Sequence, residues 1–210
     1  DFCLSRGLGD VYKRQTEDNM DPRKHFSALN IIHKIIRERV QPGDLCIDAT
    51  AGRGNDALFL AELVGETGHV TAFDIQQDAV DSTKKLLEEH GMTSRTDVLL
   101  KSHSEMDEVC EEGTVSCITF NFGWLPKGDH NIFTNKSTSI PAIEKGLKLL
   151  KSGGMMTLII YYGRETGFEE RDALLEYLPT IDSSRFTVIE MPFVNRPNCP
   201  PIPIIILKDM

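Results

Sequence analysis

Apolar residues along the chain follow two spacings, which predict helices and strands in regular succession. Between 22 and 40 they recur every three or four residues, which is the pattern of one helix face. Short apolar runs bounded by glycine, proline and polar residues predict buried strands. The sequence predicts helices over 22–40, 56–64, 77–90, 105–110, 140–150 and 169–178, and strands over 45–47, 69–73, 98–101, 115–120, 155–161, 186–193 and 202–207.

The order of these elements predicts an α/β fold. Strands that alternate with helices form a mainly parallel sheet with helices on both faces, because each crossover is right-handed. The glycine-containing segment 151–154 predicts a turn before the fifth strand. Only 194–201, with three prolines, separates the last two strands, so these should pair antiparallel. A Rossmann-like, seven-stranded sheet with a C-terminal antiparallel hairpin resembles the class I methyltransferases that use S-adenosylmethionine (SAM).

Composition fits one globular domain. The chain has 210 residues, of which 40% are hydrophobic and 26% charged, an ordinary globular balance. Residues 1–15 show no apolar core and no periodic pattern. We therefore expect 1–19 to be a non-native or disordered leader and 20–210 to be a single SAM-dependent methyltransferase domain.

Cysteine and charge patterns narrow the function classes. The five cysteines form no CxxC pair, so we expect reduced thiols, a cytoplasmic protein and no metal site. No apolar run reaches the ~20 residues of a membrane span. The net charge of −9 argues against binding nucleic acid through bulk positive charge, although an enzyme with a local basic patch is compatible with it.

A glycine-rich segment follows the first predicted strand, and it has two interpretations. The glycines within 52–54 match the dinucleotide-binding pattern, and Asp74 stands where such a site places its ribose acid. However, Asp48 at the strand end would repel a pyrophosphate, whereas it can receive the ammonium of a methionine. Asp56 at the helix start also competes with a phosphate for the same amides. These acids favour SAM over an NAD-type cofactor, which is the alternative.

Two further strand ends carry candidate cofactor contacts. Asp74 ends the second strand, where its carboxylate can accept both ribose hydroxyls; capping the next helix is a compatible alternative. Ser102 and His103 follow the third strand, which borders the adenine in this topology. A histidine on the surface of a loop is the alternative interpretation of His103.

The segment after the fourth strand predicts the chemistry. The Asn121 oxygen and the Phe122 carbonyl can accept the N–H groups of an amine and direct its lone pair at a methyl group. Trp124 could stack on a planar base, or it could simply pack the loop. Asp129 and its neighbour His130 are candidate proton acceptors. Segment 121–124 resembles the Asn-Pro-Pro-Tyr loop of exocyclic-amine methyltransferases, and the predicted catalytic residues are Asn121, Gly123, Trp124 and Asp129.

These motifs together resemble one bacterial family, long labelled rRNA methylases, whose members complete the 5-methylaminomethyl group on the wobble uridine of tRNA. The matching pieces include 40–44, 47–50, 52–56, 72–76, 102–103 and 120–129. The resemblance implies cofactor contacts at Arg53, Asn55, Asp74, Gln76, Ser102 and His103. With the residues of the glycine-rich segment, the predicted cofactor-binding set is Asp48, Thr50, Gly52, Arg53, Gly54, Asn55, Asp56, Asp74, Gln76, Ser102 and His103.

The resemblance also implies a substrate and an assembly. It implies N-methylation of the 5-aminomethyl group in the tRNA anticodon stem-loop by a homodimer, with Lys127, Lys136 and Arg164 as candidate tRNA contacts. The chain departs from the family pattern at 53–55, at Trp124 and Lys127, and after Tyr161. The alternatives are methylation of rRNA, or of a small-molecule or protein amine.

Overall fold

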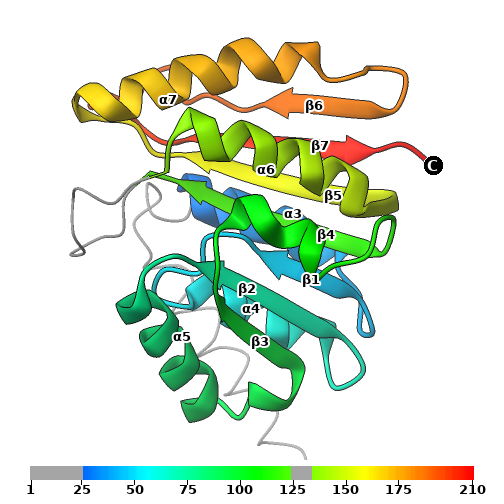
Figure 1. Cartoon of the computed structure of the whole chain (residues 1–210). Helices are drawn as coiled ribbons and strands as arrows, with labels where there is room; N and C mark the ends of the chain where they lie inside the picture. Colours follow the sequence, from blue (N-terminus) through cyan, green and yellow to red (C-terminus); the bar gives the residue numbers. More distant parts are fainter. Residues whose placement is uncertain (1–25, 124–133) are drawn as a thin grey trace, which may run out of the picture.

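A single seven-stranded sheet runs through the protein (Figure 1). The computed structural model describes residues 26–123 and 134–210. The strand order is β3-β2-β1-β4-β5-β7-β6. The strands are β1 (Leu45–Asp48), β2 (His69–Asp74), β3 (Thr96–Leu100), β4 (Val115–Phe122), β5 (Leu150–Ile160), β6 (Phe186–Glu190) and β7 (Ile202–Lys208).

Helices cover both faces of the sheet, and each face has its own apolar core. One core includes buried side chains of α3, α4 and α5; the other includes those of η2, α6 and α7. In α3, Ser27 caps the first turn by accepting a hydrogen bond from the Asn30 amide. The helices are α3 (Ala28–Arg39), α4 (Asn55–Val64), α5 (Gln77–Glu89), α6 (Lys136–Leu149) and α7 (Arg164–Tyr177), with 3₁₀ turns η1 (Thr93–Arg95), η2 (His103–Glu108) and η3 (Leu178–Thr180). No helix in the described ranges is both long and apolar enough to cross a membrane.

The order in which strands are added to the sheet switches sides at β1, and this switch between β1 and β4 positions the site. β1 pairs in parallel with β2 on one side and with β4 on the other. The chain builds the sheet outward to β3 first and then returns to β4 and β5. In open α/β sheets, ligands bind outside the carboxyl ends of the strands at such a switch point. The ends of β1 and β4, at Asp48 and Phe122, therefore mark the expected position of the site.

The C-terminal strands form the predicted antiparallel hairpin. β7 lies between β5 and β6 and runs antiparallel to both. Ile202–Ile206 of β7 is buried, which explains its unbroken apolar sequence. The predicted fold class, a mainly parallel seven-stranded sheet closed by this hairpin with helices around it, is confirmed.

Several local predictions need correction. α6 begins at Lys136 and α7 at Arg164, before the predicted starts at 140 and 169, and β6 ends at Glu190 instead of at 193. The turn expected at 151–154 belongs to β5, because the backbone pairing with β4 already begins at Leu150, and a register shift takes up the irregularity. Gly153 has a φ of 72°, which lets the backbone bulge there without ending the strand. β4 extends to Phe122, because Asn121 and Phe122 pair with the end of β5. The helix expected at 105–110 is instead the 3₁₀ turn η2.

Candidate active site

A cavity of about 480 Å³ opens at the carboxyl ends of the central strands. Most of the predicted site residues line it: Thr50, Gly52, Arg53, Asn55, Asp56, Asp74, Gln76, Ser102, His103, Asn121 and Gly123. Asp48 and Gly54 stand behind this lining. Trp124, Asp129, His130 and Lys127 lie outside the described residues. The other lining residues carry no predicted role; they are Leu29, Ala49, Ala51, Phe73, Ile75, Lys101, Thr134, Asn135, Thr138 and Tyr161.

The glycine-rich loop folds tightly against α5. Gly54 precedes α4 with a φ of 84°, a conformation that residues with a Cβ rarely adopt. A Cβ placed on Gly54 would lie 2.9 Å from the Thr83 Cα, which belongs to the backbone of α5. The Thr83 hydroxyl also donates to the Gly52 carbonyl at 3.3 Å. The loop therefore needs glycine at position 54, both for its backbone angle and for its close approach to α5.

Asp74 ties the glycine-rich loop to the end of β2. Its Oδ2 accepts a hydrogen bond from the Gly52 amide at 2.9 Å, and its Oδ1 accepts one from the Gln76 amide at 2.9 Å. Each carboxylate oxygen keeps a second lone pair for a hydroxyl group. The bonds fix the carboxylate at the cavity wall, and its role as a ribose acceptor stays a prediction.

Asp48 is completely buried beneath the loop. Its Oδ1 accepts the Thr50 amide at 3.2 Å, whereas Oδ2 has no hydrogen-bond partner among the described residues. Burial, and next the negative charge of Asp56, raise the pKa of the Asp48 carboxyl well above its usual range. An unpaired buried carboxyl oxygen is costly, and a donor group on a ligand would relieve that cost.

Ser102 and His103 close the adjoining wall. Ser102 caps η2, where it accepts a hydrogen bond from the Ser104 amide and forms a capping box with Glu105. The His103 ring lies edge-on to Phe120 at 5.9 Å between centroids. Burial lowers the pKa of His103, which favours the neutral ring. His103 Nε2 is buried and has no partner within 26–123 and 134–210, so it can bind a polar group of a ligand.

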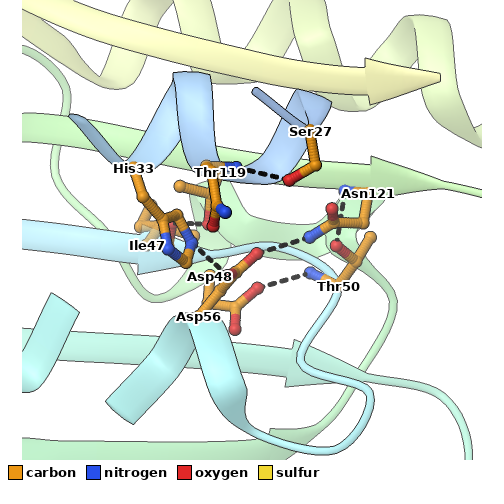
Figure 2. Close-up of polar contacts among 9 residues, drawn as sticks. Ser27, His33, Ile47, Asp48, Thr50, Asp56, Thr119 and Asn121 are labelled. Atoms are coloured by element: carbon orange, nitrogen blue, oxygen red, sulfur yellow. Dashed lines mark hydrogen bonds and ion pairs between the residues drawn. The ribbon is translucent and has the colours of Figure 1, made fainter. Parts of the chain in front are cut away.

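At the end of β4, hydrogen bonds fix Asn121 through both its backbone and its side chain (Figure 2). Its amide N–H donates to Thr50 Oγ1 at 2.7 Å, and its Nδ2 donates to Asp56 Oδ2 at 2.6 Å. A carboxylate only accepts, so the nitrogen of the Asn121 amide must face Asp56 and the oxygen must face away from it. The other Asp56 oxygen lies 2.7 Å from Nε2 of His33, a residue of α3 that the sequence analysis missed.

A second missed residue, Glu170 of α7, holds Thr134, which in turn binds Gly123 on the other side of 124–133. The Gly123 amide donates to Thr134 Oγ1 at 2.8 Å, and the Thr134 hydroxyl donates to Glu170 at 2.7 Å. Ser139 of α6 donates to the other Glu170 oxygen at 2.6 Å. Burial raises the pKa of Glu170, and the two hydroxyl donors partly offset this effect. Gly123 and Thr134 are thereby fixed beside the cavity.

The described part of the chain contains no cluster of three or more histidine, cysteine or acidic side chains that could hold a metal ion. The cavity is lined instead by carboxylates, an imidazole, hydroxyl and amide side chains, and the two basic residues Arg53 and Lys101. Such a set suits an organic ligand that carries hydrogen-bonding groups and charges of both signs.

Comparisons with known proteins identify the family of this chain. A family model described as "Putative rRNA methylase" matches residues 70–207. The chain is 34% identical over 204 residues to the Arabidopsis thaliana "tRNA (mnm(5)s(2)U34)-methyltransferase, chloroplastic", covering 93% of this chain and 72% of that protein. A crystal structure of a "putative rRNA-methylase" from Clostridium thermocellum shares 43% identity at a TM-score of 0.85, covering 87% of this chain and 97% of that one. A "putative methyltransferase" from Streptococcus mutans "in complex with SAH" shares 31% identity at a TM-score of 0.78, covering 86% and 97%.

Proposed function

Because this chain belongs to the rRNA methylase family and is a SAM-dependent methyltransferase, we propose that it N-methylates the 5-aminomethyl group of the wobble uridine of tRNA. The name of the Arabidopsis thaliana relative supports this substrate. The relatives also decide between the two cofactor interpretations in favour of SAM.

The cavity suits SAM in three independent respects. The glycine-rich loop borders the cavity with Gly52, and Gly54 lets this loop pack closely against α5. Asp48 Oδ2 and His103 Nε2 are buried polar atoms without partners among the described residues. Acidic side chains at the cavity suit a ligand that carries an ammonium and a sulfonium group. We propose that the predicted cofactor-binding set holds SAM, which supplies an electrophilic methyl group when bound.

The orientation of the Asn121 amide carries the proposal. Because its nitrogen donates to Asp56, its oxygen is available to accept an N–H of a substrate amine at the cavity. Methyl transfer requires the amine lone pair to point at the methyl carbon, and alignment of this kind supplies much of the rate enhancement. The Asn121 oxygen can bind the N–H groups of a neutral amine and leave the lone pair of the amine unobstructed. Asp129 stays the predicted acceptor of the released proton.

A nucleic-acid substrate requires local positive charge on an acidic chain. Lys136 is suitably placed, since it begins α6 directly after Asn135, which lines the cavity. We propose that Lys127, Lys136 and Arg164 bind the anticodon stem-loop, and that a cytoplasmic homodimer joins two such patches. Charge reversal at these positions should weaken tRNA binding and reduce its dependence on salt, and light scattering would measure the oligomeric state.

The decisive experiment compares acceptors with one labelled donor. The purified protein is incubated with labelled SAM and tRNA that carries 5-aminomethyl-uridine, and the nucleosides are analysed by mass spectrometry. We expect one added methyl group on the wobble nucleoside and at least a 100-fold slower reaction for Asn121→Ala, in line with the ~10²-fold cost of lost alignment. Transfer to rRNA or to small amines, with none to this tRNA, would reject the proposed substrate and leave the methyltransferase assignment intact.

A further inference from the structure

His33, Asp56 and Asn121 form a continuous chain of hydrogen bonds that ends at the cavity (Figure 2). The three residues come from α3, α4 and β4. His33 Nε2 lies 2.7 Å from Asp56 Oδ1, and Asn121 Nδ2 lies 2.6 Å from Asp56 Oδ2. These hydrogen bonds therefore link α3 to the side chain proposed to bind the amine.

The His33 ring itself is rigidly placed. It stacks on Phe59 of α4 with 3.9 Å between ring centroids and 10° between ring planes. Its side chain is only 19% exposed, and that of Asp56 is 11% exposed. Because a carboxylate only accepts hydrogen bonds, the nitrogen of His33 that faces Asp56 must carry a proton. Because the His33 ring is stacked and its N–H donor is fixed, the Asp56 carboxylate that it binds has little freedom to rotate.

Asp56 has one donor on each oxygen, and the two donors fix the plane of its carboxylate. The backbone of Asn121 is held separately by Thr50, so the remaining freedom of Asn121 is the rotation of its amide. That rotation is set by Asp56 alone among the described residues. Without His33, Asp56 could turn about its own side-chain bonds and take the Asn121 amide with it.

The charge of Asp56 also acts on neighbouring groups of the cavity. After burial, it is the next largest cause that raises the pKa of Asp48, and the same order of causes raises the pKa of Tyr161. Asp56 therefore contributes to the electrostatics of the cavity as well as to the hydrogen bond with Asn121.

We propose that His33 is a positioning residue for methyl transfer, which acts through Asp56 to hold the Asn121 amide in the orientation that presents its oxygen to the acceptor amine. This inference rests on the proposed function of Asn121. The competing explanation is a purely structural bond that joins α3 to α4.

A matched control exists elsewhere in the sheet. His69 of β2 and Asp97 of β3 form a similar pair, with Nε2 and Oδ2 2.9 Å apart. Both side chains are more exposed than those of His33 and Asp56, at 37% and 67%. Neither residue lines the cavity. His69→Leu removes a His–Asp bond without touching the site.

The first test compares variants in a single-turnover methyl-transfer assay. His33→Leu removes the donor, whereas His33→Gln keeps an N–H group that can reach Asp56. We expect His33→Leu to slow transfer by about 10–100-fold, as misplacement of a reacting group by ~1 Å does. We expect His33→Gln to stay within about 5-fold of the native rate, while both variants bind S-adenosylhomocysteine (SAH) within about 3-fold of native affinity. His69→Leu should transfer at the native rate.

The second test needs no acceptor, so it separates this inference from the substrate proposal. The side-chain amide signal of Asn121 is assigned in a ¹⁵N NMR spectrum by its loss in Asn121→Asp. His33→Leu should shift or broaden this signal, whereas His33→Gln and His69→Leu should preserve it. An unchanged signal in His33→Leu would overturn the proposal even if the protein methylates tRNA. Equal losses of rate in the two His33 variants, in proportion to their losses of stability, would overturn it in favour of the structural explanation.

Discussion

Replacing Gly54 by alanine should destabilise the glycine-rich loop through two separate costs. First, a φ of 84° costs a residue with a Cβ about 1–2 kcal/mol. Second, the new Cβ would lie 2.9 Å from the Thr83 Cα, and overpacking against a backbone atom costs about 1–3 kcal/mol. The total of about 2–5 kcal/mol corresponds to a fall in melting temperature of about 4–20 °C for a domain of this size.

Gly91 supplies a control that separates the two costs. It has a φ of 68°, and a Cβ placed on it would meet nothing within 4 Å. Gly91→Ala therefore carries only the backbone cost, about 1–2 kcal/mol or about 2–8 °C in melting temperature. Calorimetry would measure the melting temperatures, and titration with SAH would measure its affinity. We expect Gly54→Ala to weaken SAH binding by at least about 10-fold, or about 1.4 kcal/mol, and Gly91→Ala to leave it unchanged. Equal loss of stability in the two variants, or native SAH affinity in Gly54→Ala, would refute the reasoning.

Three other substitutions test the carboxylates. Asp74→Asn replaces one acceptor oxygen by a donor that faces a backbone N–H, so SAH affinity measured by calorimetry should fall by about 10–100-fold; native affinity would contradict its role. Burial raises the pKa of Asp44, but hydrogen bonds led by that from Lys151 outweigh it and the net pKa is lowered. The Asp44 carboxylate therefore stabilises the fold above its unfolded pKa of about 3.9 and loses this effect as pH falls through the folded pKa. The native protein should be more stable than Asp44→Asn at pH 7, and the difference in unfolding free energy, measured with urea, should shrink below about pH 4. A difference independent of pH would contradict the lowered pKa of Asp44. Burial raises the pKa of Glu170 above its unfolded value of about 4.3, so its stabilising contribution is greatest below that pH and declines as pH rises through the folded pKa. Between about pH 4 and 7 the native protein should therefore lose more stability than Glu170→Gln, as measured by the same urea unfolding series. Parallel pH profiles of the two proteins would contradict the raised pKa of Glu170.

Local sequence patterns predicted the position of the glycine-rich loop because its residues are contiguous along the chain. The glycines, the acid at the strand end and the helix that follows all lie within 48–64, and the strand–helix alternation places this segment at the carboxyl edge of the sheet. The antiparallel hairpin was equally predictable, since 194–201 is too short for a crossover. Both predictions depended on spacing within one segment, which sequence reveals directly.

Contacts between distant segments were not predictable in this way. A histidine at position 33 and a glutamate at position 170 look like ordinary helix residues. Their partners Asp56 and Thr134 lie 23 and 36 residues away along the chain. The error at 151–154 has the same origin, because a glycine pair indicates a turn until the pairing of β5 with β4 is known. The sequence predicts that Asn121 binds the amine, but the fixed orientation of its amide follows only from the fold.

The position of β7 in the sheet also constrains how the protein folds. Among the described strands β6 pairs with β7 alone, although β6 precedes β7 along the chain. Until β7 is in place, β6 therefore has no partner strand and the outer edge of β5 stays uncovered. Open strand edges of apolar sequence are sites where chaperones bind and aggregation begins. Docking of β7 completes both pairings in one step and covers the edge of β5.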